Sequence, residues 1–491
     1  MTAHPPASQP LASQPLASQP PASQPPASQP PALQPRASQV PFVRVVVLNY
    51  DGGEMTIDCV ESLRATTWPC ERFEIVLVDN GSIDGIAARV RRDFPAVRVL
   101  EPMSNLGFAA GCNLGMQATG AYDHVALVNN DATIEPGWLQ PLVDALESDA
   151  TLGAASSKML IAGQFHELSF SAPDAEGLGR ADRRRLGVRV SAVHVDGDRV
   201  DGRLSADEGF YAPEAPETRN GEEMAWWCGR QGMMRIASNG LPVGEVTVRL
   251  ACFDRRRVTI STRVETLDVI IDATPRWFTL PLEPKPVSVI NNVGSNLFAG
   301  GFGGDRGFLE ADRGQFDEPA EVFAWCGGAV LLRRAYLEAV GGFDERLFLY
   351  YEDTDLSWRG RLAGWRYLYV PGSIVHHRHA ASSGGVGSPV FQFHTERNRL
   401  LVLIKNAPHR VTIRALAVQA RIVAEMVVID VVRPTLTFHR PHLRRLRPKL
   451  KAMWGVAKLT PAMLADRRRS PASTAEREAL MSWETTKESL A

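Results

Sequence analysis

Short apolar runs that end in polar side chains recur along the first third of the chain. Residues 43–48, 73–78 and 125–128 are mostly aliphatic or β-branched. Runs of this kind are typical of strands that are buried on both faces of a parallel sheet. Stretches with helical spacing lie between them, at 55–65 and 83–94. This alternation predicts an α/β domain whose strands are joined by right-handed helical crossovers.

Each of these predicted strands ends in side chains that can bind a ligand. Asn49 follows the first run, Asp79 the second, and Asn129, Asn130 and Asp131 the third. The carboxyl ends of parallel strands meet at one edge, where open α/β sheets bind ligands. Carboxylate oxygens are ligands that Mg²⁺ and Mn²⁺ prefer. Polar residues after one strand also fit ordinary turn chemistry, so the convergence of three strand ends is what favours a site.

A glycine-rich segment, residues 105–115, opens the next predicted helix. Its small residues would let backbone N–H groups approach an anion, although close packing of helix on sheet explains them almost as well. The sequence contains neither GxGxxG after the first strand nor GxxxxGK[ST]. A dinucleotide site or a P-loop is therefore disfavoured.

The pattern changes between residues 165 and 286, where helical spacing fades and short alternating or β-branched runs follow one another. Such spacing predicts a β-sandwich, and because α/β alternation resumes afterwards we expect a domain inserted into a loop. Trp226, Trp227 and Trp277 could form a platform that stacks on sugars. We favour the alternative that these rings are part of the sandwich core.

The α/β pattern resumes in residues 287–405, after a glycine-rich stretch at 287–317 that reads as a long, partly mobile loop. Glu352, Asp353 and Asp355 crowd the start of a predicted helix beside aromatic residues. Acidic residues cap helices, but crowded carboxylates beside apolar rings can also have the raised pKa values that suit a general base. His376, His377 and His379 follow a further strand and are candidate metal ligands; the alternative is a hydrophilic loop.

The two ends of the chain differ from the domains between them. Residues 1–40 are a Pro/Ser/Gln-rich five-residue repeat with little to bury, so we expect a disordered or PPII-like tail. Residues 406–491 are helical and basic, and the apolar stretch 411–432 is interrupted by charges. This pattern fits an amphipathic helix at an anionic membrane surface, and equally a helix packed on the catalytic domain or in an oligomer.

Composition narrows the class without naming a function. The 491 residues are 44% hydrophobic and 22% charged, as in an ordinary soluble globular protein, and the net charge of -1 gives no sign of nucleic-acid binding. Six cysteines without a CxxC pair argue against a disulfide scaffold or a cysteine zinc site and favour a reducing cytoplasm. We expect no signal peptide and no transmembrane helix.

Five motifs, taken together, resemble the inverting family 2 glycosyltransferases of the GT-A fold, in particular the rhamnosyltransferase and galactofuranosyltransferase branch that builds bacterial surface polysaccharides. The motifs are Asp79-Asn80-Gly81-Ser82, Asn105-x-Gly107-Phe108-Ala109, Asn129-Asn130-Asp131, Gly341-Gly342-Phe343-Asp344 and Glu352-Asp353-x-Asp355-Leu356. The resemblance covers residues 43–162 and 287–405. It implies a Rossmann-like, mostly parallel sheet split into two halves, 41–164 and 287–405, with the β-sandwich insert and the C-terminal helical region outside it.

The resemblance also implies roles for individual residues. Asp353 would be the catalytic base, and Glu352 would orient it or the acceptor. Asp131 and His377 would hold Mn²⁺ or Mg²⁺, with His376 and His379 as rivals; because Asn129 replaces the usual first acid, affinity would rest on Asp131. The residues expected to bind the donor are Asn49, Asp79, Asn80, Ser82, Asn105, Gly107, Asn113, Asn129 and Asn130. Those expected at the acceptor are Trp325, Gly327, Gly328 and Asp355.

The resulting hypothesis is a cytoplasmic transferase, peripheral at the inner face of the plasma membrane. It would move a sugar from a nucleotide-diphospho-sugar to a glycan or lipid-linked glycan, with dTDP-rhamnose favoured over UDP-galactofuranose as donor. In one-step inversion, the base deprotonates the acceptor hydroxyl and the metal neutralises the diphosphate leaving group. The paired carboxylic acid that a glycosidase uses is then not needed. The alternative is a carbohydrate-binding protein built on a degenerate transferase fold.

Overall fold

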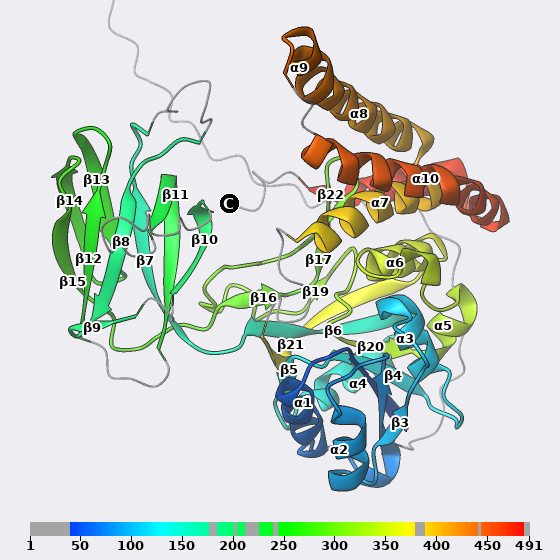
Figure 1. The fold of residues 1–491 in the computed structure, drawn as a ribbon. Coiled ribbons are helices and arrows are strands. Elements are labelled where there is room, and N and C mark those ends of the chain that lie inside the picture. The colour runs from blue at the N-terminus through cyan, green and yellow to red at the C-terminus, as the bar shows by residue number, and fades with distance from the viewer. Residues whose placement is uncertain are drawn as a thin grey trace, which may run out of the picture.

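The computed structural model describes residues 40–175, 184–200, 204–211, 225–238, 244–378, 388–439 and 443–485. Two large sheets and a C-terminal group of helices make up these ranges (Figure 1). The expected repeat tail lies outside the described residues, apart from Val40.

Four parallel strands form one half of the first sheet, in the order β3-β2-β1-β4. They are β1 (Val43–Asn49), β2 (Phe73–Asp79), β3 (Arg98–Leu100) and β4 (His124–Asn129). Asn49 pairs in register with Asp79, and Leu48 with Asn129. The polar ends of three apolar runs therefore meet at one edge, as the sequence pattern predicts.

Helices cover both faces of this sheet because the side chains of each strand alternate in direction. Val45 and Val47 face a core formed with α1 (Glu54–Arg64), α2 (Ile86–Asp93) and α4 (Leu139–Ser148). Val46 faces the other core, formed with α3 (Gly107–Met116), α5 (Arg334–Val340) and α6 (Glu352–Leu362). Two short 3₁₀ turns, η1 (Cys70–Arg72) and η3 (Glu345–Leu347), lie in the connections.

The other half of this sheet is mixed, which corrects the expectation of a mostly parallel sheet. β20 (Ala329–Arg333) runs antiparallel to both β4 and β6 (Leu152–Ile161), and β21 (Arg366–His377) is parallel to β6. Three short strands extend this side: β5 (Ala132–Ile134), β16 (Ile290–Asn292) and β19 (Ala320–Glu321). Two parallel neighbouring strands need a crossover connection, which is usually a helix. The segment that leads into β20, residues 287–328, is fully described and contains no helix. β20 can therefore run antiparallel to its neighbours.

A second, antiparallel sheet of nine strands forms a separate unit beside the first (Figure 1, green). Its strands are β7 (Phe165–Ser171), β8 (Arg189–Val195), β9 (Asp198–Arg199), β10 (Leu204–Phe210), β11 (Trp226–Ala237), β12 (Glu245–Ala251), β13 (Arg256–Ser261), β14 (Thr266–Ile271) and β15 (Arg276–Pro281). β11 pairs with β7 along 231–237 and with β8 at 226–227, and the strands enclose their own apolar core. Trp226 and Trp227 are buried, whereas Trp277 is 50% exposed.

The C-terminal region packs on the α/β unit as a layer of helices. Its elements are α7 (Pro389–Asn406), α8 (His409–Val427), the π-helical turn η4 (Val428–Val432), α9 (Arg433–Leu436), α10 (Leu443–Arg469), α11 (Thr474–Ala479) and η5 (Leu480–Trp483). Leu403 of α7 shares an apolar core with Val456 and Met463 of α10 and with Trp358 of α6. α8 begins in the same core through Val411 and Ala415, and its far end and α9 project from the body as an arm (Figure 1).

The glycine-rich stretch 287–317 is ordered into short strands, which corrects the expectation of a long, partly mobile loop. β17 (Ser295–Phe298) and β18 (Phe302–Asp305) form an antiparallel hairpin. β22 (Glu484–Thr485), at the end of the described chain, adds to β17 as a third, parallel strand. None of the helices described in the structure is long and apolar enough to cross a membrane.

Candidate active site

A connected polar network joins the carboxyl ends of β1, β2 and β4. Asn49 is fully buried, and its Nδ2 donates to Asp79 Oδ1 at 3.0 Å and to Ser82 Oγ at 3.1 Å. Its Oδ1 accepts from Thr56 Oγ1 at 2.7 Å and from Asn130 Nδ2 at 3.1 Å. Asn49 and Asn130 thus use their amides on protein partners: they shape the edge and hold Asp79 and Ser82 in place.

The Asn105–Gly107 loop is tied to the end of β2. Asn80 Nδ2 donates to Asn105 Oδ1 at 3.0 Å and to the Gly107 carbonyl at 3.1 Å. Gly107 has φ 82°, and a Cβ there would lie 2.5 Å from the Phe348 ring. A Cβ at Gly111 would lie 2.4 Å from a Leu48 methyl carbon. Close packing of helix on sheet therefore explains these glycines. Asn80 and Asn105 use their side chains to hold the 105–107 loop against the end of β2.

Asn113 does not face the donor edge, so the prediction that it binds donor is wrong. Its Nδ2 donates to the Phe343 carbonyl at 2.9 Å and to Glu345 Oε1 at 3.0 Å. Its Oδ1 accepts from the Phe343 N–H at 2.9 Å. The side chain links α3 to the Gly341–Asp344 turn, and both ends of its amide are used on that turn.

Asp131 and His377 come together from β4 and β21, as expected for a metal pair. His377 Nε2 lies 3.0 Å from Asp131 Oδ1 and 3.3 Å from Asn129 Nδ2. His377 Nδ1 lies 3.0 Å from Asn291 Oδ1, so an Nδ1–H donates to that amide and turns Nε2 towards Asp131. Carbonyl partners orient metal-binding histidines in this way. Sequence analysis missed Asn291, because an Asn-Asn pair inside a glycine-rich stretch reads as a turn.

The rival histidines do not join this pair in the described structure. His376 points to the opposite side of β21, where its Nε2 lies 3.5 Å from Glu135 Oε1. His379 lies outside the described residues. Among the residues that are described, no three His, Cys, Asp or Glu side chains form a metal-binding group. Asp131 and His377, with the Asn129 amide beside them, nonetheless fit one side of a divalent-cation site, because carboxylate and neutral imidazole both bind such ions.

The candidate base lies at the start of α6. Asp353 Oδ2 accepts from the Gly327 N–H at 3.3 Å and Oδ1 from the Thr354 N–H at 2.6 Å. Burial raises the pKa of Asp353 above its usual range. Burial, and then the charge of Asp353, raises the pKa of Glu352 to about 8. The raised pKa favours the neutral form of Glu352, and Asp353, whose carboxylate is oriented by two backbone N–H groups, is the candidate base.

The turn that leads into α6 is strained. Phe348, Tyr350 and Tyr351 all have positive φ, between 66° and 71°, which costs of order 1–3 kcal/mol for each such residue. Asn398 of α7 is fully buried and stabilises this turn: its Nδ2 donates to the carbonyls of Leu347, Leu349 and Tyr350 at 2.7–2.9 Å. Asn398 was missed by sequence analysis; the only signal is a polar residue that begins an apolar helical run.

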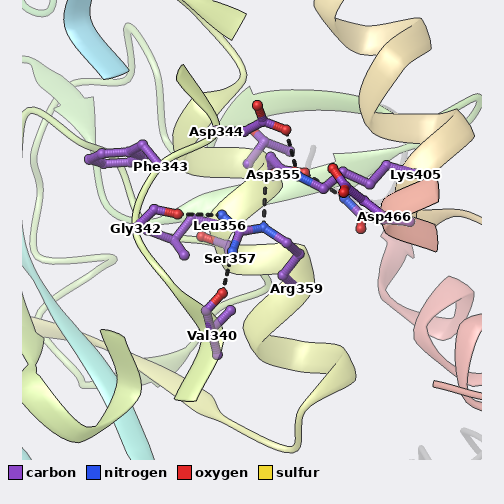
Figure 2. Close-up of polar contacts among 12 residues, drawn as sticks. Val340, Gly342, Phe343, Asp344, Asp355, Leu356, Ser357, Arg359, Lys405 and Asp466 are labelled. Atoms are coloured by element: carbon purple, nitrogen blue, oxygen red, sulfur yellow. Dashed lines mark hydrogen bonds and ion pairs between the residues drawn. The ribbon is translucent and has the colours of Figure 1, made fainter. Parts of the chain in front are cut away.

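Asp355 belongs to a buried ion cluster, so its predicted role at the acceptor is wrong. Its Oδ2 accepts from Lys405 Nζ at 2.9 Å and from Arg359 Nε at 2.8 Å, and its Oδ1 from Asn406 Nδ2 at 2.8 Å. Lys405 also binds Asp344 Oδ2 at 2.7 Å (Figure 2). With 0% of its side chain exposed, Asp355 fastens α6 to α7 and cannot reach a ligand.

We expect Lys405→Met to lower the free energy of unfolding by about 3–5 kcal/mol, because it leaves Asp355 and Asp344 buried without the cation they share. Urea denaturation measures the change. Lys458→Met is the matched control: this lysine of α10 is exposed, so its loss should cost less than about 0.5 kcal/mol. Equal stability of the two variants would contradict the structural role of the cluster.

Of the other residues expected at the acceptor, Trp325 lies in the apolar core, whereas Gly327 and Gly328 lie in a turn beside Asp353. Trp325 is fully buried and packs on the Phe343 ring, with centroids 6.0 Å apart, so its predicted acceptor role is wrong. Gly327 donates to Asp353, as described above. The Gly328 carbonyl accepts from the Asn129 N–H at 3.0 Å, and a Cβ at Gly328 would meet Met159 Cε at 2.7 Å. The Gly327–Gly328 turn therefore connects the start of α6, with the candidate base, to the end of β4, two residues before Asp131.

Comparison with known proteins identifies relatives of the first half of this site. Residues 44–170 match the model of the family described as glycosyl transferase family 2. N-acetylglucosaminyl-diphospho-decaprenol L-rhamnosyltransferase of Mycobacterium tuberculosis (strain H37Rv) is 35% identical over 136 residues, which are 24% of this chain and 44% of the relative. Rhamnosyltransferase WbbL of Escherichia coli K12 is 43% identical over 60 residues, 12% of this chain and 23% of the relative. The chain thus spans less than half of the length of these relatives.

Solved structures align along more of the chain but only loosely. The mannosyltransferase PcManGT of Pyrobaculum calidifontis, in complex with GDP-Man and Mn²⁺, is 13% identical and covers 93% of this chain and 89% of its own, with a TM-score of 0.38. GalNAc-T7 with UDP, GalNAc and Mn²⁺ is 14% identical and covers 74% of this chain and 48% of its own, with a TM-score of 0.41. Similarity this low assigns no ligand or residue role to the chain.

Proposed function

We propose that this chain, whose residues 44–170 are a domain of glycosyl transferase family 2 with rhamnosyltransferases among its relatives, transfers a sugar from a nucleotide-diphospho-sugar to a glycan hydroxyl. One observation carries the proposal. In the Gly327–Gly328 turn, the Gly327 N–H donates to the Asp353 carboxylate. The Gly328 carbonyl accepts from the Asn129 N–H at the end of β4, two residues before Asp131. This turn links the candidate base to the strand end that precedes the candidate metal ligand Asp131.

The chemistry that we propose divides between these two parts. A divalent cation held by Asp131 and His377 would neutralise the diphosphate leaving group. Asp353 takes the proton from the acceptor hydroxyl, and the Gly327 N–H orients its carboxylate. Glu352 remains protonated beside it and cannot compete as a base at neutral pH. One-step attack on the side of the sugar opposite the diphosphate inverts the anomeric centre.

The names of the relatives favour a particular donor and acceptor. One relative is an L-rhamnosyltransferase whose name places N-acetylglucosaminyl-diphospho-decaprenol as its acceptor, and another is also a rhamnosyltransferase. We therefore propose dTDP-rhamnose as donor, ahead of UDP-galactofuranose, and a lipid-linked glycan as acceptor. Release of nucleoside diphosphate from each donor, with a GlcNAc-diphospho-lipid as acceptor, tests this choice. Equal or greater turnover of UDP-galactofuranose would contradict the proposed donor.

We further propose that the α8–α9 arm rests on an anionic membrane, where a lipid-linked acceptor would be found. Its tip exposes several apolar side chains, among them Leu436 at 74% and Phe438 at 99%. Arg433 and His439 beside them are also exposed and would face lipid phosphates. Cationic side chains next to exposed apolar groups are typical of interfacial helices.

Replacing both Leu436 and Phe438 by Asp should weaken binding to vesicles that contain phosphatidylglycerol by at least about tenfold, since each large apolar side chain contributes about 1.5–3 kcal/mol when buried. Cosedimentation at low and high salt measures the binding. Ile270→Asp, at a 52% exposed position of the β unit, is the control. Unchanged vesicle binding of the double variant would remove the arm from this role.

Point variants are needed for this test because deletion would damage the fold. A chain that ends at Pro408 would lose α10, which shares a core with α7, and Arg477, whose Nη1 donates to the Asn406 carbonyl at 2.8 Å. The tail is thus at once a packed layer on the catalytic domain and, through its arm, our candidate membrane contact.

A further inference from the structure

The β17–β18 hairpin brings one further carboxylate, Asp305, to the candidate active site. The Gly303 N–H donates to the Tyr351 hydroxyl at 3.4 Å, and a Cβ at Gly303 would lie 3.2 Å from Thr354 Oγ1. The Ser295 N–H donates to the Ala324 carbonyl at 2.9 Å, three residues before Gly327. The hairpin therefore lies against both segments that hold the base Asp353.

Asp305 lies within electrostatic reach of the candidate base. Desolvation by the surrounding protein, together with the nearby Asp353, raises the pKa of the Asp305 carboxyl to about 6. Asp305 is itself an exposed residue at the end of β18, so a ligand can reach its carboxylate from solvent.

One amide orients Asp305, and its neighbour orients the metal-binding histidine. Asn292 Nδ2 donates to Asp305 Oδ1 at 2.6 Å, while Asn291 Oδ1 accepts from His377. Within the described residues no Lys or Arg pairs with Asp305. The short strand β16 thus directs two side chains into the site, and the second oxygen of Asp305 remains for a ligand.

A second observation points to a ligand at the same place. Glu352 is only 6% exposed, and its Oε2 has no hydrogen-bond partner in the described structure. Burial, and then the charges of Asp305, Asp353 and Glu352, raise the pKa of the Cys326 thiol well above its usual range. Buried oxygens without partners are costly unless a ligand satisfies them. A sugar, which presents several neighbouring hydroxyl donors and no charge, meets this need.

We propose that Asp305 accepts a hydrogen bond from the acceptor sugar, at a hydroxyl next to the one that Asp353 deprotonates, and so selects and positions the acceptor. The inference rests on the proposed sugar transfer and names the residue that recognises the acceptor. Asn292 acts through Asp305 as a positioning residue.

The C-terminal segment sets the position of this hairpin. Glu484 Oε1 accepts from the Gly300 N–H at 2.8 Å, and β22 pairs with β17. Arg399 Nη1 donates to the Gly300 carbonyl at 2.8 Å, and its guanidinium lies over the Phe302 ring, 4.1 Å from the centroid. Residues 99 and 184 positions from Gly300 along the chain therefore hold the hairpin that carries Asp305.

The test compares three variants of the full chain with dTDP-rhamnose as donor and a GlcNAc-diphospho-polyprenol as acceptor. Asp305→Asn should raise KM for the acceptor about ten- to a hundredfold, the worth of a hydrogen bond to a charged group, and leave the calorimetric Kd for donor unchanged. Asn292→Ala should shift the acceptor KM in the same direction by less. Asn291→Ala, the matched control, should raise the Mn²⁺ concentration needed for activity and leave the acceptor KM unchanged.

Each outcome decides between the claims. Wild-type chain that turns over no nucleotide sugar contradicts the proposed function, and this inference with it. Active wild type with an unchanged acceptor KM in Asp305→Asn overturns the inference alone. A raised Mn²⁺ requirement in Asp305→Asn would assign Asp305 to the cation instead. If Asp305→Asn melts well below wild type, Asn292→Ala, which keeps the carboxylate, gives the deciding KM.

Discussion

Asp353→Asn should lower kcat by about 10²–10⁴-fold, the usual contribution of a positioned general base, and leave donor binding intact. The replacement has the same shape, and the Gly327 N–H can still donate to the remaining oxygen, so the start of α6 should keep its structure. Steady-state kinetics with donor binding by calorimetry measure both effects. Asp268→Asn, at an exposed position of β14, is the control for the same chemical change away from the site.

The neighbouring acid and the pH profile make this test specific. Because the pKa of Glu352 is raised to about 8, the side chain is largely neutral at pH 7, and Glu352→Gln should cost far less than Asp353→Asn. A base works only when ionised, and burial raises the pKa of Asp353. Turnover should therefore increase as pH rises through that raised value, above the pKa of about 4 of a free aspartate. Near-normal kcat in Asp353→Asn, or an equal loss in Glu352→Gln, would remove Asp353 from the role of base.

Removing the metal pair should have an effect of similar size. We expect activity to require Mn²⁺ or Mg²⁺ and to be lost in excess chelator, because a diphosphate leaves poorly until its charge is neutralised. His377→Ala and Asp131→Ala should each weaken Mn²⁺ binding by more than the 10–100-fold that is usual for loss of an orienting partner. Calorimetric Mn²⁺ binding gives a readout that does not depend on turnover.

The chain supplies its own control for this experiment. His376 is the residue before His377 on β21, but it points to Glu135 on the other side of the strand. His376→Ala should therefore bind Mn²⁺ as the wild type does. Full activity in excess chelator, or equal effects of the two histidine variants, would contradict the metal site.

Sequence reasoning correctly predicted that the polar ends of these strands meet at one edge, because parallel strands leave little freedom in where they end. Once residues 43–48 and 73–78 are read as neighbouring buried strands, their polar ends must meet, and Asn49 does pair with Asp79 in register. The pairing of Asp131 with His377 followed from the family resemblance rather than from spacing, since β21 begins more than 230 residues after β4. The comparisons support that resemblance for residues 44–170.

Three of the errors share one cause: a residue type does not reveal a partner that is distant in sequence. Asp355 looked like a ligand-binding acid, but Lys405, fifty residues later, neutralises it. Asn113 looked like a donor contact, but its partner is the Phe343 backbone, 230 residues away. The hairpin that carries Asp305 looked mobile because its stabilising strand β22 comes from the far end of the chain.

We propose that one chain both activates a nucleotide sugar and transfers the sugar with inversion. The most direct measurement incubates the full chain with Mn²⁺, a GlcNAc-diphospho-lipid and each of a panel of dTDP-, UDP- and GDP-sugars, and determines the anomeric configuration of any product by NMR. We expect release of nucleoside diphosphate from one donor, and a new glycoside whose configuration is opposite to that of the donor. Binding of glycan without turnover of any donor, or a product with retained configuration, would contradict it.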